Sequence, residues 1–216
     1  MKNKQKEIIK KRKIQENKKE RRYLIPKDNP IRNGFLDSLT YLKESKKCIY
    51  FAILLFILTI LIGFFFAPNF VYLDKSIEQL IKKTLNYEGF DLVAFIFQNN
   101  LLVAFISLFT GIIFTLPTLA FLISNGVLIG YVINKVSAVA GFLVIWRLIP
   151  HGIFELPAIL ISFGLGIKLG LFIFSKKPFS TLRDRLYSSI KVFIFIVIPL
   201  LVLAALIEGL LITFFK

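Results

Sequence analysis

The densest group of residues that could do chemistry is the run Pro-His-Gly-Ile-Phe-Glu-Leu-Pro at positions 150–157. His151 and Glu155 are four residues apart, so on a helix they share one face and can interact. Pro150 suits the first turn of such a helix, and Gly152 would let a neighbouring backbone approach closely. A helix start that carries an imidazole and a carboxylate could bind an anion, relay protons or hold part of a metal site.

The rest of the chain does not complete an enzyme site around these residues. A catalytic zinc needs about three protein ligands, and His151 is the only histidine in the chain. The sequence has no Gly-x-Ser-x-Gly nucleophile motif, and its single cysteine, Cys48, allows no disulfide within one copy. We therefore expect no catalytic residues, no bound metal and no cofactor. An intramembrane enzyme is kept only as a remote alternative to the functions weighed below.

Charge and apolar residues are segregated along the 216 residues, of which 56% are hydrophobic although the net charge is +15. Residues 1–47 carry a net charge of +10 and residues 175–191 a net charge of +4. Residues 92–134 form a run of 43 positions without a charge. Because about 20 apolar residues cross a bilayer as a helix, this pattern predicts an all-α membrane protein with several spans. The apolar runs do not alternate with polar residues as barrel strands do.

The lengths of the apolar runs predict five transmembrane helices in one bundle, which covers residues 29–216. The segment 137–149 is too short to cross, so we expect it to be interfacial or re-entrant. The predicted spans lie at about residues 49–67, 92–113, 116–135, 151–174 and 191–215.

The basic segments predict the orientation of this bundle. With the N-terminus inside, five spans place both basic segments in the cytoplasm and the C-terminus outside the cell membrane. Asn29–Pro30 suits a helix start, and apolar residues at helical spacing follow it, which predicts an amphipathic interfacial helix before the first span. A second amphipathic helix, with Asp74 as a possible cap, is predicted at 74–89 on the opposite side.

The first 28 residues form a basic segment with too few apolar residues to fold alone. We expect a disordered tail or a solvated charged helix in the cytoplasm. Such a segment fixes the orientation of a membrane protein and can also bind anionic lipid headgroups. Nucleic acid is a less suitable partner, because the charge belongs to one face of a membrane bundle.

Several polar residues fall at membrane depth, where a central charge costs about 2.5–3.5 kcal/mol on insertion scales. Asparagines there can hydrogen-bond across helices, and ionisable residues can pair or serve a function. The predicted polar intramembrane cluster consists of Asn99, Asn100, Asn125, His151, Gly152, Glu155, Lys168 and Glu208.

Glycines at helical spacing predict tight helix packing within the same spans. They favour a compact bundle, and a homodimer is possible. The predicted packing glycines are Gly126, Gly130, Gly164, Gly166 and Gly170.

The order of these motifs resembles the stage II sporulation protein M family of integral membrane proteins. The resemblance covers about residues 32–215 and rests on Asn99 and Asn100, on Asn125 with its following glycines, and on the run at 150–157. In spore-forming bacteria, the namesake of this family is a polytopic membrane scaffold for a complex that remodels septal peptidoglycan. The resemblance implies the same architecture and a role with other envelope proteins, but not sporulation itself.

Two functions therefore remain open alongside the intramembrane enzyme. One is a non-enzymatic scaffold or assembly factor of an envelope complex. The other is a transporter or permease-like protein that uses the intramembrane His, Glu and Asn side chains, since transporter sites are commonly built from polar groups near mid-membrane. No inverted repeat is visible in the sequence, and a cavity that joins Asn100, Asn125 and Glu155 would favour transport.

Overall fold

A computed structural model describes residues 30–84, 87, 89–141 and 144–214, with the backbone alone at 144–151 and 210–214. These residues form helices and turns without a strand, as the sequence predicts. The predicted basic tail at 1–28 lies outside the described residues. In chain order the elements are α2 (Pro30–Glu44), α3 (Lys46–Phe65), η1 (Ala67–Leu73), α4 (Asp74–Thr84), α5 (Phe90–Phe109), η2 (Thr110–Ile113), α6 (Thr115–Ala140), α7 (Val144–Gly170), η3 (Leu171–Phe174), α8 (Pro178–Val192), η4 (Phe193–Val197) and α9 (Ile198–Phe214).

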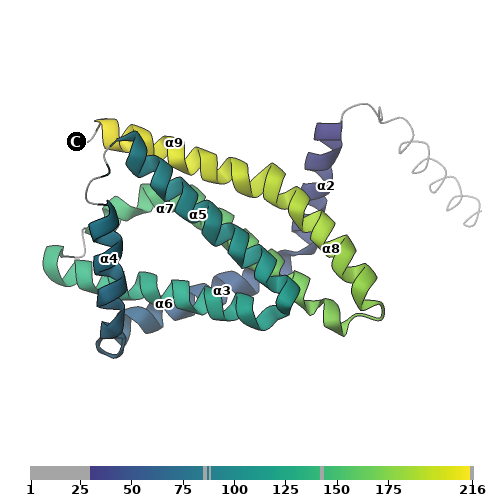
Figure 1. Cartoon of the computed structure of the whole chain (residues 1–216), viewed down its shortest axis with the longest axis horizontal. Coiled ribbons are helices and arrows are strands. Elements are labelled where there is room, and N and C mark those ends of the chain that lie inside the picture. Colours follow the sequence, from purple (N-terminus) through teal and green to yellow (C-terminus); the bar gives the residue numbers. More distant parts are fainter. Residues whose placement is uncertain (1–29, 85–86, 88, 142–143, 215–216) are drawn as a thin grey trace, which may run out of the picture.

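Five helical segments in the described part of the chain are long and apolar enough to cross a membrane, which confirms the predicted number. They contain α3, α5, α6, α7 and α9. Figure 1 shows that α3, α6 and α9 run away from the end of the bundle that holds α2, while α5 and α7 run back toward it. The bundle is therefore a set of crossings that alternate in direction, and further helices join α3 to α5 and α7 to α9.

The amphipathic segments lie at the two ends of this bundle. In Figure 1, α2 and α8 lie at one end, and α4 lies at the opposite end together with the last turn of α9. In the same view, α2 and α4 are roughly transverse to α3 and α6. The first span ends at Phe65, close to the break expected at Pro68, and Pro68 lies in the first turn of the 3-10 helix η1 that leads to α4.

The prediction of a re-entrant segment at residues 137–149 is wrong, whereas an interfacial position of these residues stays a prediction. Helix α6 continues to Ala140, Gly141 turns the chain with φ of 76°, and α7 begins at Val144. The segment is therefore divided between two long helices, where it forms neither a re-entrant nor a separate interfacial element. Pro150 consequently lies two turns inside α7, and the helix start expected at that proline does not exist.

The basic segment before the last span is mostly helical. Helix α8 runs without a break through the π-helical turn η4 into α9. The π turn has a local cause in Pro199, which lacks an N–H and whose ring crowds the carbonyl of Phe195 four residues earlier. The continuous helix formed by α8, η4 and α9 therefore begins at Pro178, well before the predicted span at 191–215.

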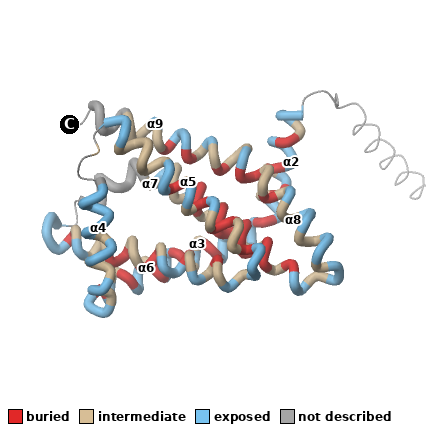
Figure 2. Tube along the Cα trace, viewed as in Figure 1, coloured by how far each residue is buried: buried red, intermediate tan, exposed pale blue. Residues whose placement is uncertain are grey.

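Helix α7 is the centre of the bundle, because it packs against α3, α5, α6 and α9. In its most apolar stretch 61% of the residues are buried, against 22–28% in the other four spans. Figure 2 shows this buried stretch in the middle of the molecule. The core includes Ala158 and Phe163 from α7, Phe56 from α3, Leu108 from α5 and Leu122 from α6.

Each predicted packing glycine lies at a helix crossing. An added Cβ at Gly130 of α6 would meet the backbone of Ile60 in α3, and one at Gly126 would meet Thr59. On α7, a Cβ at Gly166 would meet the Ser107 carbonyl of α5. The two remaining glycines also face another element: Gly164 meets Ile49, and Gly170 meets Thr115.

Candidate functional site

The asparagines of the predicted polar cluster bond within their own helices. Asn100 is 7% exposed, and its side-chain oxygen accepts a hydrogen bond from Asn99 Nδ2 at 3.3 Å. Asn125 Nδ2 donates to the Phe121 carbonyl oxygen, one turn earlier in α6, at 2.8 Å. Neither of these bonds joins two helices, whereas the sequence suggests that these asparagines hydrogen-bond from one helix to another.

The motif at 150–157 lies on the first half of α7. The side chain of His151 is outside the described residues. Among the described residues, an added Cβ at Gly152 would meet Leu156 of the same helix at 3.3 Å and no backbone of another helix. Glu155 of α7 is half-buried, as is Glu208 of α9, and these two helices pack against each other.

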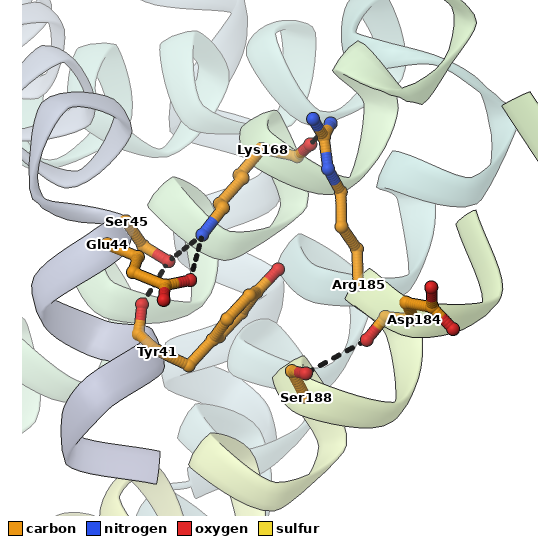
Figure 3. Close-up of polar contacts among 7 residues, drawn as sticks. All are labelled: Tyr41, Glu44, Ser45, Lys168, Asp184, Arg185 and Ser188. Carbon is orange, nitrogen blue, oxygen red and sulfur yellow. Dashed lines mark hydrogen bonds and ion pairs between the residues drawn. The ribbon is translucent and has the colours of Figure 1, made fainter. Parts of the chain in front are cut away.

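Lys168 does not join the predicted cluster. Thirteen residues of α7 separate it from Glu155, which corresponds to about 20 Å of helix rise. Its side chain is 15% exposed and points to the junction of α2 and α3 (Figure 3). The ammonium Nζ donates to Ser45 Oγ at 3.0 Å and lies 3.7 Å from the centroid of the Tyr41 ring.

We call Tyr41, Glu44, Ser45 and Lys168 the Lys168 cluster. Glu44 is its outermost member, with a side chain 63% exposed and a carboxylate oxygen 3.9 Å from Lys168 Nζ. Ser45 is the single residue between α2 and α3, and its hydroxyl also donates to the Tyr41 carbonyl oxygen at 2.7 Å. A buried ammonium needs such partners, so this arrangement holds the bend between α2 and α3 against α7.

Helix α8 is attached to the same region by two further cations. Arg185 Nη1 donates to the main-chain carbonyl of Lys168 at 2.5 Å. Lys191 Nζ donates to Asp37 Oδ2 of α2 at 2.8 Å. The end of the bundle that holds α2 and α8 is therefore built from side-chain contacts among α2, α7 and α8.

A different polar contact fixes α4 at the opposite end. Asp74 accepts hydrogen bonds from Tyr131 Oη at 2.6 Å and from Lys135 Nζ at 3.0 Å, both from α6. These two donors, the tyrosine first, hold the pKa of the Asp74 carboxyl below its usual value. Asp74 has helical φ and ψ, so it does not cap α4 as expected, and its carboxylate binds α6 instead. Asn134 Nδ2 adds a bond to the Phe64 carbonyl of α3 at 3.1 Å.

Grooves lie between α5 and α9 and between α4 and α6 on the surface of the described residues. The groove between α5 and α9 has a volume of about 670 Å³ and is apolar, and the one between α4 and α6 has about 360 Å³. Asn100, Asn125 and Glu155 line neither of them. Among the described residues, no three His, Cys, Asp or Glu side chains are grouped closely enough to hold a metal ion.

Neither the Lys168 cluster nor the contact of Asp74 with α6 was predicted from the sequence, because the residues that meet are far apart in the chain. Ser45 and Lys168 are separated by 123 positions, and Asp74 and Lys135 by 61. The second contact leaves one local signal, since Tyr131 and Lys135 are four residues apart and therefore share a face of α6.

Comparison with known proteins agrees with the architecture. The sequence profile described as stage II sporulation protein M matches residues 52–211, which is most of the chain. The chain belongs to this family. Two similar proteins come from Methanocaldococcus jannaschii. Uncharacterized protein MJ0706 is 33% identical over 77% of this chain and 81% of its own length, and uncharacterized protein MJ0793 is 32% identical over 74% of this chain and 90% of its own length. No solved structure matches the chain significantly.

Membership of the stage II sporulation protein M family and the five candidate spans together make the chain a multi-pass membrane protein. The profile match runs from within α3 to within α9 and does not include the described helix α2. The contacts of α2 are therefore a feature that the family match does not cover.

Proposed function

We propose that this member of the stage II sporulation protein M family is a non-enzymatic scaffold that assembles a complex of membrane or envelope proteins. The observation that carries the proposal is the dispersal of the polar residues within the spans. Lys168 is engaged about 20 Å of helix rise away from Glu155. The bonds of Asn99, Asn100 and Asn125 stay within single helices, and Asn134 bonds to α3 next to the α4 end of the bundle. Polar groups arranged in this way stabilise a bundle and do not form one continuous path.

The proposed orientation has the N-terminus in the cytoplasm and the C-terminus outside the cell membrane. In support, the end that holds α2 and α8 carries described basic residues from both segments, including Lys46, Lys176 and Arg183. Basic residues are retained on the cytoplasmic side of membrane proteins. Anionic lipid headgroups are the proposed partners of the basic N-terminal segment. A homodimer is compatible with the proposal, and nucleic acid is not among the proposed partners.

The alternative function is transport, and one observation favours it. Glu155 and Glu208 are half-buried carboxyl groups on α7 and α9, within segments long enough to span the membrane. Ionisable residues in such positions mark proton or substrate pathways in many transporters.

A flux measurement separates the two functions. The full chain would be reconstituted into sealed liposomes, and the movement of protons and small anions would be compared for the wild type and for Glu155→Gln. The scaffold proposal predicts flux no faster than in protein-free liposomes for both proteins, because a scaffold needs no polar path across the bundle. Flux in the wild type that disappears in Glu155→Gln, but persists in a Lys176→Gln control at the basic end, would overturn it.

A further inference from the structure

Helix α2 has three distinct sides, which follow from 3.6 residues per turn. One side is buried against the bundle and contains Gly34, Ser38 and Tyr41. A Cβ at Gly34 would meet the Phe195 ring at 2.6 Å, so this side makes close contact with η4. The small residues of this side set how deeply α2 docks.

The second side carries the acidic residues of α2, and both are engaged with lysines of the bundle. Asp37 accepts a hydrogen bond from Lys191 at 2.8 Å, and Glu44 lies 3.9 Å from Lys168 (Figure 3). Their negative charges are therefore matched by cations of α8 and α7. This pairing leaves the remaining side of α2 without a described acidic residue.

The third side combines exposed apolar and basic residues. Ile31, Phe35 and Leu36 are 69%, 43% and 44% exposed. Exposed lysines follow this strip along the chain, with Lys43 at the end of α2 and Lys46 and Lys47 at the start of α3. An apolar strip beside unmatched positive charge is typical of a helix that lies in a membrane interface and binds anionic lipids.

We propose that this third side of α2, which we call the outer face, binds the anionic headgroups and the upper acyl region of the adjacent leaflet. Charge complementarity selects this occupant, because the outer face is basic and the preceding residues 1–29 add 12 basic side chains against four acidic ones. The geometry supports it as well. Helix α3 alone has the 20 residues needed to span the membrane, so α2 is not required for the crossing. Figure 1 shows α2 lying across the end of the bundle, where a leaflet surface would be.

The proposal is tested by measuring the depth of α2 in vesicles of defined composition. A nitroxide would be attached at Phe35→Cys in a full chain whose native thiol is removed by Cys48→Ser. Its accessibility to oxygen and to a water-soluble nickel complex would be compared in phosphatidylcholine vesicles and in vesicles where phosphatidylglycerol replaces about a third of the lipid. A label at Thr40→Cys, exposed beyond the apolar strip, serves as the aqueous control.

We expect the label at position 35 to enter the acyl region in the anionic vesicles, with a several-fold rise in the ratio of oxygen to nickel accessibility, while the label at position 40 stays in water. Reversing Lys43, Lys46 and Lys47 to Glu should abolish this rise, since each lysine near an anionic surface strengthens binding by about five-fold. The matched control reverses Lys75, Lys82 and Lys83 of α4 at the other end and should leave the rise intact.

Two outcomes would overturn the proposal. One is a label at position 35 that remains as exposed to nickel in anionic vesicles as in neutral ones. The other is immersion that survives the charge reversal and also survives high salt, where screening shortens the Debye length to about 3 Å at 1 M. The salt series uses the unreversed chain, so it gives a result even if the triple variant does not insert. The proposal concerns lipid binding only, and liposome flux tests the scaffold function separately.

Discussion

Replacing Gly130 by alanine is expected to destabilise the bundle by about 3 kcal/mol, the upper part of the usual cost of overpacking. The added methyl group would meet backbone atoms of Ile60 and Phe64 in α3, which cannot rotate away as a side chain can. Alanine favours a helix over glycine by about 1 kcal/mol, and this gain is too small to offset the clash. The measurement is the free energy of unfolding in detergent micelles, followed by circular dichroism.

Gly209→Ala in α9 is the matched control, because an added Cβ there would lie at an ordinary 3.7 Å from Val93. We expect this variant to be neutral or slightly more stable than the wild type. Equal stabilities for Gly130→Ala and Gly209→Ala would contradict the close α3 to α6 contact.

Replacing Lys168 by methionine should cost about 2 kcal/mol and loosen the bend between α2 and α3. The change removes a charge-assisted hydrogen bond to Ser45 and the interaction with the Tyr41 ring. Such interactions contribute about 1–3 kcal/mol each. Part of this loss is offset, because methionine does not carry the cost of removing a charged ammonium from water. Glu44 contributes little to this cost, because its side chain is 63% exposed and exposed ion pairs are worth about 1 kcal/mol or less.

Two measurements check the effect of Lys168→Met. Unfolding gives the energetic cost, and the distance distribution between spin labels on α2 and α8 should broaden relative to the wild type. Lys176→Met, which removes an exposed lysine at the same end, is the control and should change neither. An unchanged distribution and unchanged stability in Lys168→Met would show that the Lys168 cluster does not hold the bend.

The number of spans and the helical class could be predicted because the signal is local. A run of about 20 apolar residues has few ways to satisfy its backbone in a bilayer other than as a helix. Breaks were also visible where a residue type forces them, as at Pro68. The family resemblance was likewise within reach, since the motif at 150–157 is a contiguous run, and the profile match bears it out.

Helix ends and contacts between distant residues could not be predicted in the same way. Pro150 suggested a helix start, yet α7 continues through it, since tertiary packing can tolerate a proline inside a long membrane helix. The contacts of Lys168 could not be predicted for a related reason. Lys168 and Glu155 lie in one span, but the partners of Lys168 come from a segment 123 positions away.

The most direct test of the scaffold account is whether water reaches the polar residues within the spans. Single cysteines at Asn100, Asn125 and Glu155, in the Cys48→Ser chain, would be treated with a charged thiol reagent from each side of sealed vesicles. The account predicts no labelling at these positions from either side, while control cysteines at Lys176 and Lys82 react from opposite sides. Labelling of Glu155 from one side together with Asn100 or Asn125 from the other would reveal a continuous aqueous path and contradict the account.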